Sequence, residues 1–302
     1  MLGNLLEYGE RDKEIDTALL SMIILVITLI FIFTSGVLIE NQTVENIVSS
    51  EYISDFNLAI FRTTCAIICF FTLAWIVLDP KGAPDFPLYF KERKVLPRHR
   101  KGLTRLAAYT MWHFGLIGIN FLVSATASWM TILGIIVPKW ILIISPILFF
   151  TSFTSAILVT CVVSFHIIGD AMSRRQNIDH LFYWYEIVMH NFNVIILAIA
   201  LVINNIEVDW KYFAFPIIFG IMYVIWARIY AIIEGVYIYD FMDPRLNGAP
   251  IIYSFLLILQ TIFFGIVAFL DWLVVWNIGL GIVVISIGTY SIVTVRNPSS
   301  RI

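Results

Sequence analysis

Two residues that could act together in catalysis stand inside long apolar segments of this chain. Thr110 lies early in the apolar run Leu106 to Trp129, and His190 lies in the run Leu181 to Ile203. A hydroxyl next to an imidazole can form a nucleophile and its base, because an imidazole titrates near neutrality. The alternative for Thr110 is a hydroxyl bonded back to a carbonyl of its own helix.

Several other polar residues occur at a similar depth. Glu186, His190 and Asn193 are spaced i, i+4 and i+7, so a helix would place them on one face. Ionisable side chains inside a span cost about 2.5 to 3.5 kcal/mol each, and they usually face the interior of a bundle. Together with His113 and Arg228, the three residues on this helix face predict a cleft that opens toward the cytoplasmic leaflet.

That cleft could serve catalysis or the relay of protons. A relay needs polar groups through the whole thickness of the membrane, and the outer half of the predicted bundle has few of them. Arg62 is an exception near the outer end of its run, where an arginine can extend its charged head to the interface. Glu186 and Arg228 could also form a structural ion pair between helices.

Metal and cofactor chemistry find little support in the sequence. The five histidines include no pair at i, i+3 or i+4, and no Gly-rich phosphate loop is present, so we expect neither a metal site nor a cofactor. The three cysteines stand in apolar runs and predict buried thiols rather than a disulfide framework.

The composition places the chain in a membrane. Hydrophobic residues make up 60% of the 302 residues and charged residues only 13%, whereas soluble domains carry about 25% charged residues. This balance excludes a soluble enzyme and a disordered chain. The net charge of -2 leaves no basic surface for nucleic acid.

Eight apolar runs approach the roughly 20 residues that a helix needs to cross a bilayer. Asp271 alone separates the last two, which could instead be one helix and a re-entrant segment. We therefore predict an all-α, polytopic transmembrane bundle with about eight spans. The runs are Ala18 to Ile39, Leu58 to Leu78, Leu106 to Trp129, Ile141 to Ile168, Leu181 to Ile203, Tyr212 to Tyr237, Ile251 to Leu270 and Trp272 to Val295.

The basic residues predict the orientation. The connection 79–105 holds eight Lys and Arg against three acids, and such loops stay in the cytoplasm. Both termini then face the cytoplasm, on the side that also holds Arg174, Arg175, Arg245, Arg296 and Arg301. The chain divides into an N-terminal tail with two additional helices (1–78), the basic cytoplasmic loop (79–105), a six-helix core (106–295) and a cytoplasmic tail (296–302).

Within that core, the segment FGIMYVIWARIYAIIEGVYIYDFMD, residues Phe219 to Asp243, resembles the signature of the androgen-induced protein family. That family includes the androgen-dependent TFPI-regulating protein and is related to the rolling stone proteins. Asp240 stands where the family usually has proline. EIVMHN, residues Glu186 to Asn191, and AAYTMWHFGLIGINFL, residues Ala107 to Leu122, are similar to the segments that carry the family histidine and threonine.

The resemblance implies a multi-pass membrane hydrolase of fatty acid esters of hydroxy fatty acids. Thr110 would be the nucleophile and His190 the base. The negative charge that develops on the ester oxygen needs a hydrogen-bond donor. The candidates for this donor are His113, Asn191, Asn193 or a backbone amide. Arg228 could hold a substrate carboxylate. The expected partners are membrane lipids or a lipid ester, in the endoplasmic reticulum, another endomembrane or the plasma membrane. The alternative function is a non-catalytic subunit or scaffold that binds other membrane proteins.

Overall fold

The computed structural model describes residues 5–39, 42–174 and 177–298. Within them, seven helical segments are long and apolar enough to cross a membrane. The prediction of an all-α bundle is confirmed, and these segments indicate an integral membrane protein. They are α1 (Glu14–Thr34), α3 (Asp55–Leu78), α4 (Tyr109–Ile132), α5 (Lys139–Cys161) with its continuation to Ser173, α7 (Trp184–Ile187) with α8 (Asn193–Ile203), α9 (Ala214–Glu234) and α10 (Ala249–Trp276).

Two of these segments contain π-helical turns. The turn η3 (Val162–Ile167) joins α5 to α6 (Ile168–Ser173), and the turn η5 (Val188–Phe192) joins α7 to α8. A π turn inserts an extra residue into a helix and often marks a functional site. A short helix, α2 (Val44–Val48), lies between α1 and α3. Short 3₁₀ turns connect other helices: η2 (Gly102–Ala107), η4 (Asp179–Phe182), η6 (Trp210–Phe213) and η7 (Asp240–Met242).

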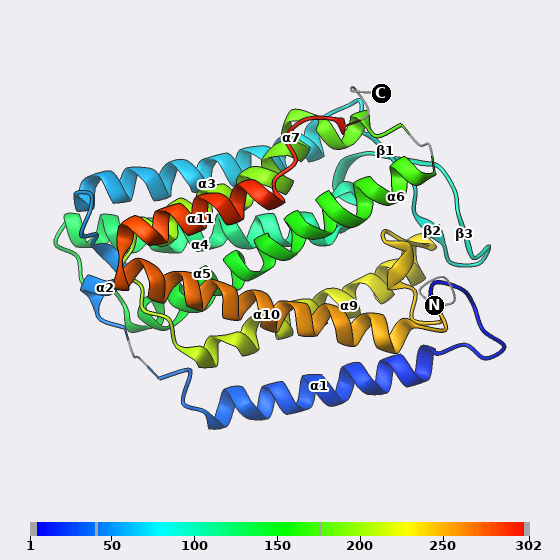
Figure 1. The fold of residues 1–302 in the computed structure, drawn as a ribbon, viewed down its shortest axis with the longest axis horizontal. Helices are drawn as coiled ribbons and strands as arrows, with labels where there is room; N and C mark the ends of the chain where they lie inside the picture. The colour runs from blue at the N-terminus through cyan, green and yellow to red at the C-terminus, as the bar shows by residue number, and fades with distance from the viewer. Residues whose placement is uncertain (1–4, 40–41, 175–176, 299–302) are drawn as a thin grey trace.

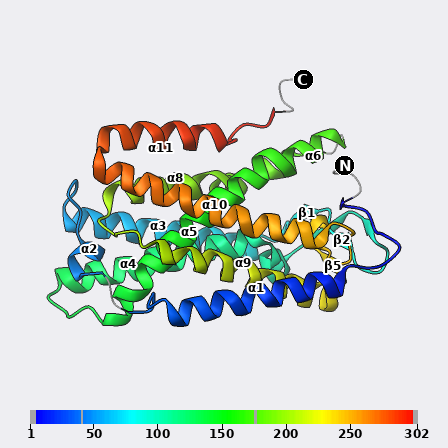
Figure 2. The same ribbon diagram turned by 60° about the horizontal axis from the view of Figure 1, so that its bottom comes forward.

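The bundle is built around α5, which runs through its middle (Figure 1). Of an apolar stretch of 18 residues in this segment, 78% are buried inside the protein, against 17% of such a stretch in α1. Figure 2 shows α1 along one edge of the bundle and α11 (Ile278–Ile292) along the opposite edge. Because lipid is as apolar as leucine, edge helices keep large hydrophobic side chains on their outer face.

The end of the chain differs from the predicted boundaries. Asp271 does not interrupt the helix but lies buried inside α10, which continues to Trp276. The chain reverses at Asn277, whose extended backbone ends α10 and whose side chain accepts a hydrogen bond from the Leu280 backbone N–H at 3.0 Å. α11 then runs back along α10 (Figure 2). Its 15 residues span about 22 Å.

The basic connection 79–105 forms small sheets, which the sequence analysis did not predict. Strand β1 (Ala83–Asp85) pairs with β4 (Arg98–Arg100), and β2 (Leu88–Tyr89) pairs with both β3 (Lys94–Val95) and β5 (Val236–Tyr237). All these pairs are antiparallel. The connection is therefore tied to the segment that follows α9, and both lie at one end of the bundle (Figure 1).

The described ends of the chain share that end of the bundle. The beginning of α1 and the end of α11 lie on the side of the strands (Figure 1). The segment before α1 is held there by Tyr8, whose hydroxyl donates to the Asp243 carboxylate at 2.8 Å. Of the basic residues that predicted orientation, Arg175 and Arg301 lie outside the described residues, as do 299–302 of the predicted tail.

One glycine allows the chain to turn from α9 into β5. Gly235 ends α9 with a left-handed backbone (φ 74°), and its carbonyl accepts from the Phe90 backbone N–H at 2.8 Å. A side chain is disfavoured in this conformation by about 1 to 2 kcal/mol. Apart from the residues adjacent in sequence, no atom lies within 4 Å of the position that a Cβ would take. The strain would therefore arise from the backbone conformation alone.

Gly235→Ala should therefore lower the free energy of unfolding by about 1 to 2 kcal/mol, measured by thermal or SDS unfolding in detergent micelles. The matched control is Gly265→Ala in the middle of α10, where a Cβ also meets open space but φ is not positive. That variant should be as stable as the parent, or more stable by up to about 1 kcal/mol. Equal losses in both variants would contradict the assigned conformation.

Candidate functional site

Two cavities of different polarity meet at the start of α4. The first, named here the polar chamber, has a volume of about 200 Å³. The second, the apolar slot, has a volume of about 80 Å³. Apolar side chains contribute to the walls of the chamber, and its charged and imidazole groups are Asp85, Arg100, Arg105, His166, Asp170, Arg174, His180, Glu186, His190 and Asp240. The slot is lined mainly by aromatic and aliphatic side chains, including Tyr109, Leu158, Val162, Tyr223, Tyr253 and Leu256, with Gln260 at its deep end.

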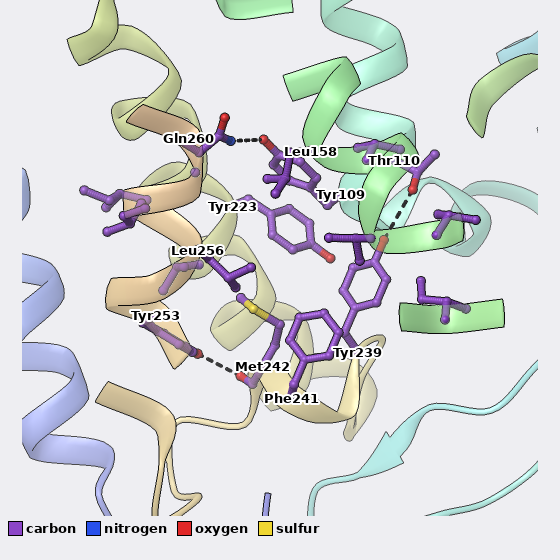
Figure 3. A pocket seen from close by; sticks show the side chains of 18 of the residues that line it. Tyr109, Thr110, Leu158, Tyr223, Tyr239, Phe241, Met242, Tyr253, Leu256 and Gln260 are labelled. Atoms are coloured by element: carbon purple, nitrogen blue, oxygen red, sulfur yellow. Dashed lines mark hydrogen bonds between the residues drawn. The ribbon is translucent and has the colours of Figure 1, made fainter. Parts of the chain in front are cut away.

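Four residues line both cavities: Thr110, Ile167, Tyr239 and Phe241. They form the wall where the slot meets the chamber. Figure 3 views the slot and shows Thr110 and Tyr239 directed toward each other at its edge, with the Tyr223 ring between them and Gln260. The Thr110 Oγ1 and Tyr239 Oη atoms are 3.4 Å apart. Thr110 is the hydroxyl-bearing residue of α4 that reaches both environments.

Thr110 departs from the usual behaviour of a threonine in a membrane helix. Thr72 and Thr126 donate to the carbonyl of residue i-4, at 2.7 and 2.8 Å. Thr110 makes no such bond, because it is the second residue of α4 and residue i-4, Leu106, belongs to the preceding turn. Its hydroxyl is consequently available to the cavities.

The start of α4 is fixed by side chains from α9. The carbonyl of Ala107 accepts hydrogen bonds from Tyr223 Oη and Trp226 Nε1, both at 3.3 Å. The two rings also pack against α4, with Tyr223 5.1 Å from Tyr109 and Trp226 5.5 Å from Trp112 between ring centroids. Two residues of the sequence motif in α9 thus position the turn that carries Thr110.

His190 enters the chamber from the π turn η5. Its Nε2 lies 3.5 Å from Glu186 Oε2, and its Nδ1 has no hydrogen-bond partner among the described residues. The backbone carbonyl of His190 accepts from Thr160 Oγ1 at 2.8 Å, which ties the turn to α5. His190 therefore has one nitrogen beside a carboxylate and one nitrogen without a partner. Such a pair can orient an imidazole as a base.

The other π turn, η3, lines the chamber as well. It contributes His166 and Ile167. Thr110 and His190 both line this chamber, but no hydrogen bond joins these two described residues. Catalytic hydrogen bonds are often long in the absence of substrate.

Four of the predicted residues line neither cavity: His113, Asn191, Asn193 and Arg228. His113 is fully buried, and neither of its ring nitrogens has a hydrogen-bond partner among the described residues. Asn193 faces α5, where its side-chain oxygen accepts from Thr160 Oγ1 at 3.2 Å. Asn191 holds the end of the chain, because its amide accepts from the Thr294 backbone N–H at 2.7 Å and donates to the Thr294 carbonyl at 3.2 Å.

Arg228 and Arg62, the two arginines within predicted spans, have partners other than those expected from the sequence. Arg228 forms an ion pair with Glu14 of α1 rather than with Glu186, and it donates to Tyr237 Oη at 3.2 Å. Arg62 does not reach the interface. It is 3% exposed and donates to Ser128 Oγ at 2.8 Å, so it joins α3 to α4. A buried hydroxyl and the Ser124 carbonyl on the neighbouring helix accept from its guanidinium, which the sequence of α3 alone could not indicate.

Sequence reasoning missed two residues of the site. Tyr239 belongs to the sequence motif, but the sequence analysis gave it no role. Burial raises the pKa of its phenol, and hydrogen bonds with Thr110 oppose this rise. The phenol therefore remains protonated and can donate beside Thr110. Arg105 was counted only as a loop charge, yet it is 2% exposed and lines the chamber.

Compared with known proteins, the chain matches no family model, no curated protein and no solved structure. What the site can do follows from its own geometry.

The role of Asn191 can be tested by proteolysis. Asn191→Ala removes both hydrogen bonds to Thr294, each of which contributes about 0.5 to 1.5 kcal/mol. We expect trypsin to cleave after the exposed Arg296 about tenfold faster, as measured by mass spectrometry of the native protein in detergent. Tyr290→Phe, at a position 87% exposed, is the matched control and should leave the rate unchanged. An unchanged rate in Asn191→Ala would contradict this anchoring.

Proposed function

We propose that this protein is an intramembrane hydrolase of lipid esters, with fatty acid esters of hydroxy fatty acids as the substrate class. The observation that carries the proposal is the position of Thr110 between an apolar slot and a polar chamber that also contains His190. An acyl chain fits the chemistry of the slot, and a polar substituent with attacking water fits that of the chamber. The ester carbonyl would then lie at the boundary, beside the hydroxyl.

In this mechanism the Thr110 Oγ atom attacks the acyl carbon while its proton passes to His190. Glu186, 3.5 Å from His190 Nε2, orients the imidazole and stabilises its charged form. The tetrahedral intermediate breaks the ester C–O bond, and the leaving alkoxide takes the proton from His190. Water then hydrolyses the acyl-threonine by the same proton transfers and releases the fatty acid.

Tyr239 is the best placed donor for the negative oxygen of the intermediate. Its hydroxyl lies 3.4 Å from Thr110 Oγ1, and a neutral donor in a low-dielectric site stabilises developing charge. His113, Asn191 and Asn193 lie outside the two cavities, so Tyr239 replaces them in this role. Arg228, paired with Glu14, is likewise not assigned to the substrate.

The family assignment and the orientation belong to the same proposal. We assign the chain to the androgen-induced protein family, on the motif residues that hold the first turn of α4. We also propose that α11 is an eighth span and that both termini are cytoplasmic, in an endomembrane or the plasma membrane. In support, the basic connection and the described ends of the chain lie at one end of the bundle (Figure 1).

A second function, a non-catalytic subunit or scaffold of a membrane complex, is favoured by one observation. Thr110 and His190 line the same chamber without a hydrogen bond between them. In that case the cavities would bind lipid without turnover, and substitutions at Thr110 would leave every measured property of the purified protein unchanged except lipid affinity.

Purified protein in nanodiscs should hydrolyse a branched fatty acid ester, and Thr110→Ala or His190→Ala should lower kcat/KM by at least about 100-fold. Thr110→Ser, which keeps the hydroxyl, should retain turnover. The matched control is Thr126→Ala on the same helix, where the hydroxyl is bonded to Leu122. Release of the fatty acid is measured by mass spectrometry. Turnover that survives both alanine substitutions would exclude the proposed mechanism.

A further inference from the structure

The polar chamber contains more charge than the proposed hydrolysis uses. Its walls hold three arginines and four carboxylates, and most of these groups neutralise one another. Arg100 pairs with Asp85 at 2.8 Å, and Arg174 pairs with Asp170 at 2.9 Å and with Asp240 at 3.5 Å. These pairs leave one arginine of the chamber to be explained.

Arg105 is bound on one side only. Its Nη1 donates to the carbonyl of Ile76 at 2.7 Å and lies 3.5 Å from Asp79, which does not line the chamber. Its Nη2 is buried and has no hydrogen-bond partner among the described residues. The Tyr185 ring lies 5.1 Å from the guanidinium carbon and covers its face, so the edge of the guanidinium remains for a ligand.

A buried guanidinium nitrogen without an acceptor has a large desolvation cost, and an anionic oxygen is the acceptor that relieves it best. We infer that Arg105 binds the free carboxylate of an amphiphile whose ester or hydroxyl group lies at Thr110. This inference deepens the proposed function, on which it rests for the position of the ester. It makes Arg105 the residue that distinguishes esters with a free carboxylate from neutral lipid esters.

The charge balance of the chamber favours a carboxylate over a phosphate. A carboxylate carries one charge and can accept from the unpartnered Nη2 of Arg105, whose Nη1 already lies beside Asp79. A phosphate monoester carries about -1.5 to -2 charges at neutral pH and would face four carboxylates on the same walls. The basic side chains needed for the second charge are already paired with Asp85, Asp170 and Asp240.

Binding is measured in the full-length Thr110→Ala protein in nanodiscs, where no probe is consumed. The probes are a hydroxy fatty acid, its methyl ester and an alkyl phosphate of the same length. The acid should bind about 10- to 100-fold more tightly than the methyl ester. Arg105→Gln should bring this ratio close to one, Arg105→Lys should restore part of it, and Lys101→Gln, an exposed neighbour outside the chamber, should keep the parent ratio.

Comparing two probes on each variant removes any effect of partial unfolding. Equal binding of acid and methyl ester by protein with Arg105 intact would overturn the inference, even if Arg105→Gln did not fold. Tighter binding of the alkyl phosphate would overturn it as well. Turnover by the Thr110-containing protein is assayed separately. An acid preference without turnover removes the hydrolase but keeps the carboxylate site, whereas turnover without an acid preference does the reverse.

Discussion

The carbonyl of Ala107 is the point on which the site depends. A helix begins where the first turn can be held in place, because its first N–H groups have no partners within the helix. Here the extended backbone of Ala108 (ψ 148°) separates the preceding turn from α4, which starts at Tyr109. The Ala107 carbonyl before it accepts from Tyr223 and Trp226 of α9, which holds this junction in place. Thr110 thereby comes too early in the helix to bond to its own backbone, and its hydroxyl reaches the cavities.

The same constraint explains why two environments meet at this hydroxyl. The α9 side of the junction supplies Tyr223 and the slot, whereas the connection 79–105 and the π turns supply charged and imidazole groups. β5 pairs with β2, and this pairing carries Tyr239 to the boundary. A lipid ester has one apolar and one polar part, and an enzyme that cleaves it needs an environment for each part next to the carbonyl.

Much of the fold could be predicted from the sequence, because hydropathy over about 20 residues decides which segments enter a bilayer. The break at Asn277 was missed because a buried Asp271 looks like a loop residue until its helix is seen to continue. The sheets of the connection 79–105 were also missed, since strands of two or three residues have no measurable period.

The candidate site was predicted in part. Thr110, Glu186 and His190, which the sequence analysis expected in one cleft, line the same chamber. The 3.6-residue period failed for Asn193 because the intervening π turn rotates the following residues toward α5. Asn191 and Arg228 were misplaced because their partners, Thr294 and Glu14, come from distant parts of the chain. Spacing within a single helix contains no information about such contacts.

The most direct test of the central claim is to find the acyl group on the protein. Purified protein mixed with a slowly hydrolysed fatty acid ester and quenched in acid is digested and analysed by mass spectrometry. The account predicts an acyl group on the hydroxyl of Thr110, absent from the Thr110→Ala protein. No acyl group on any residue, or one on a different residue, would contradict it.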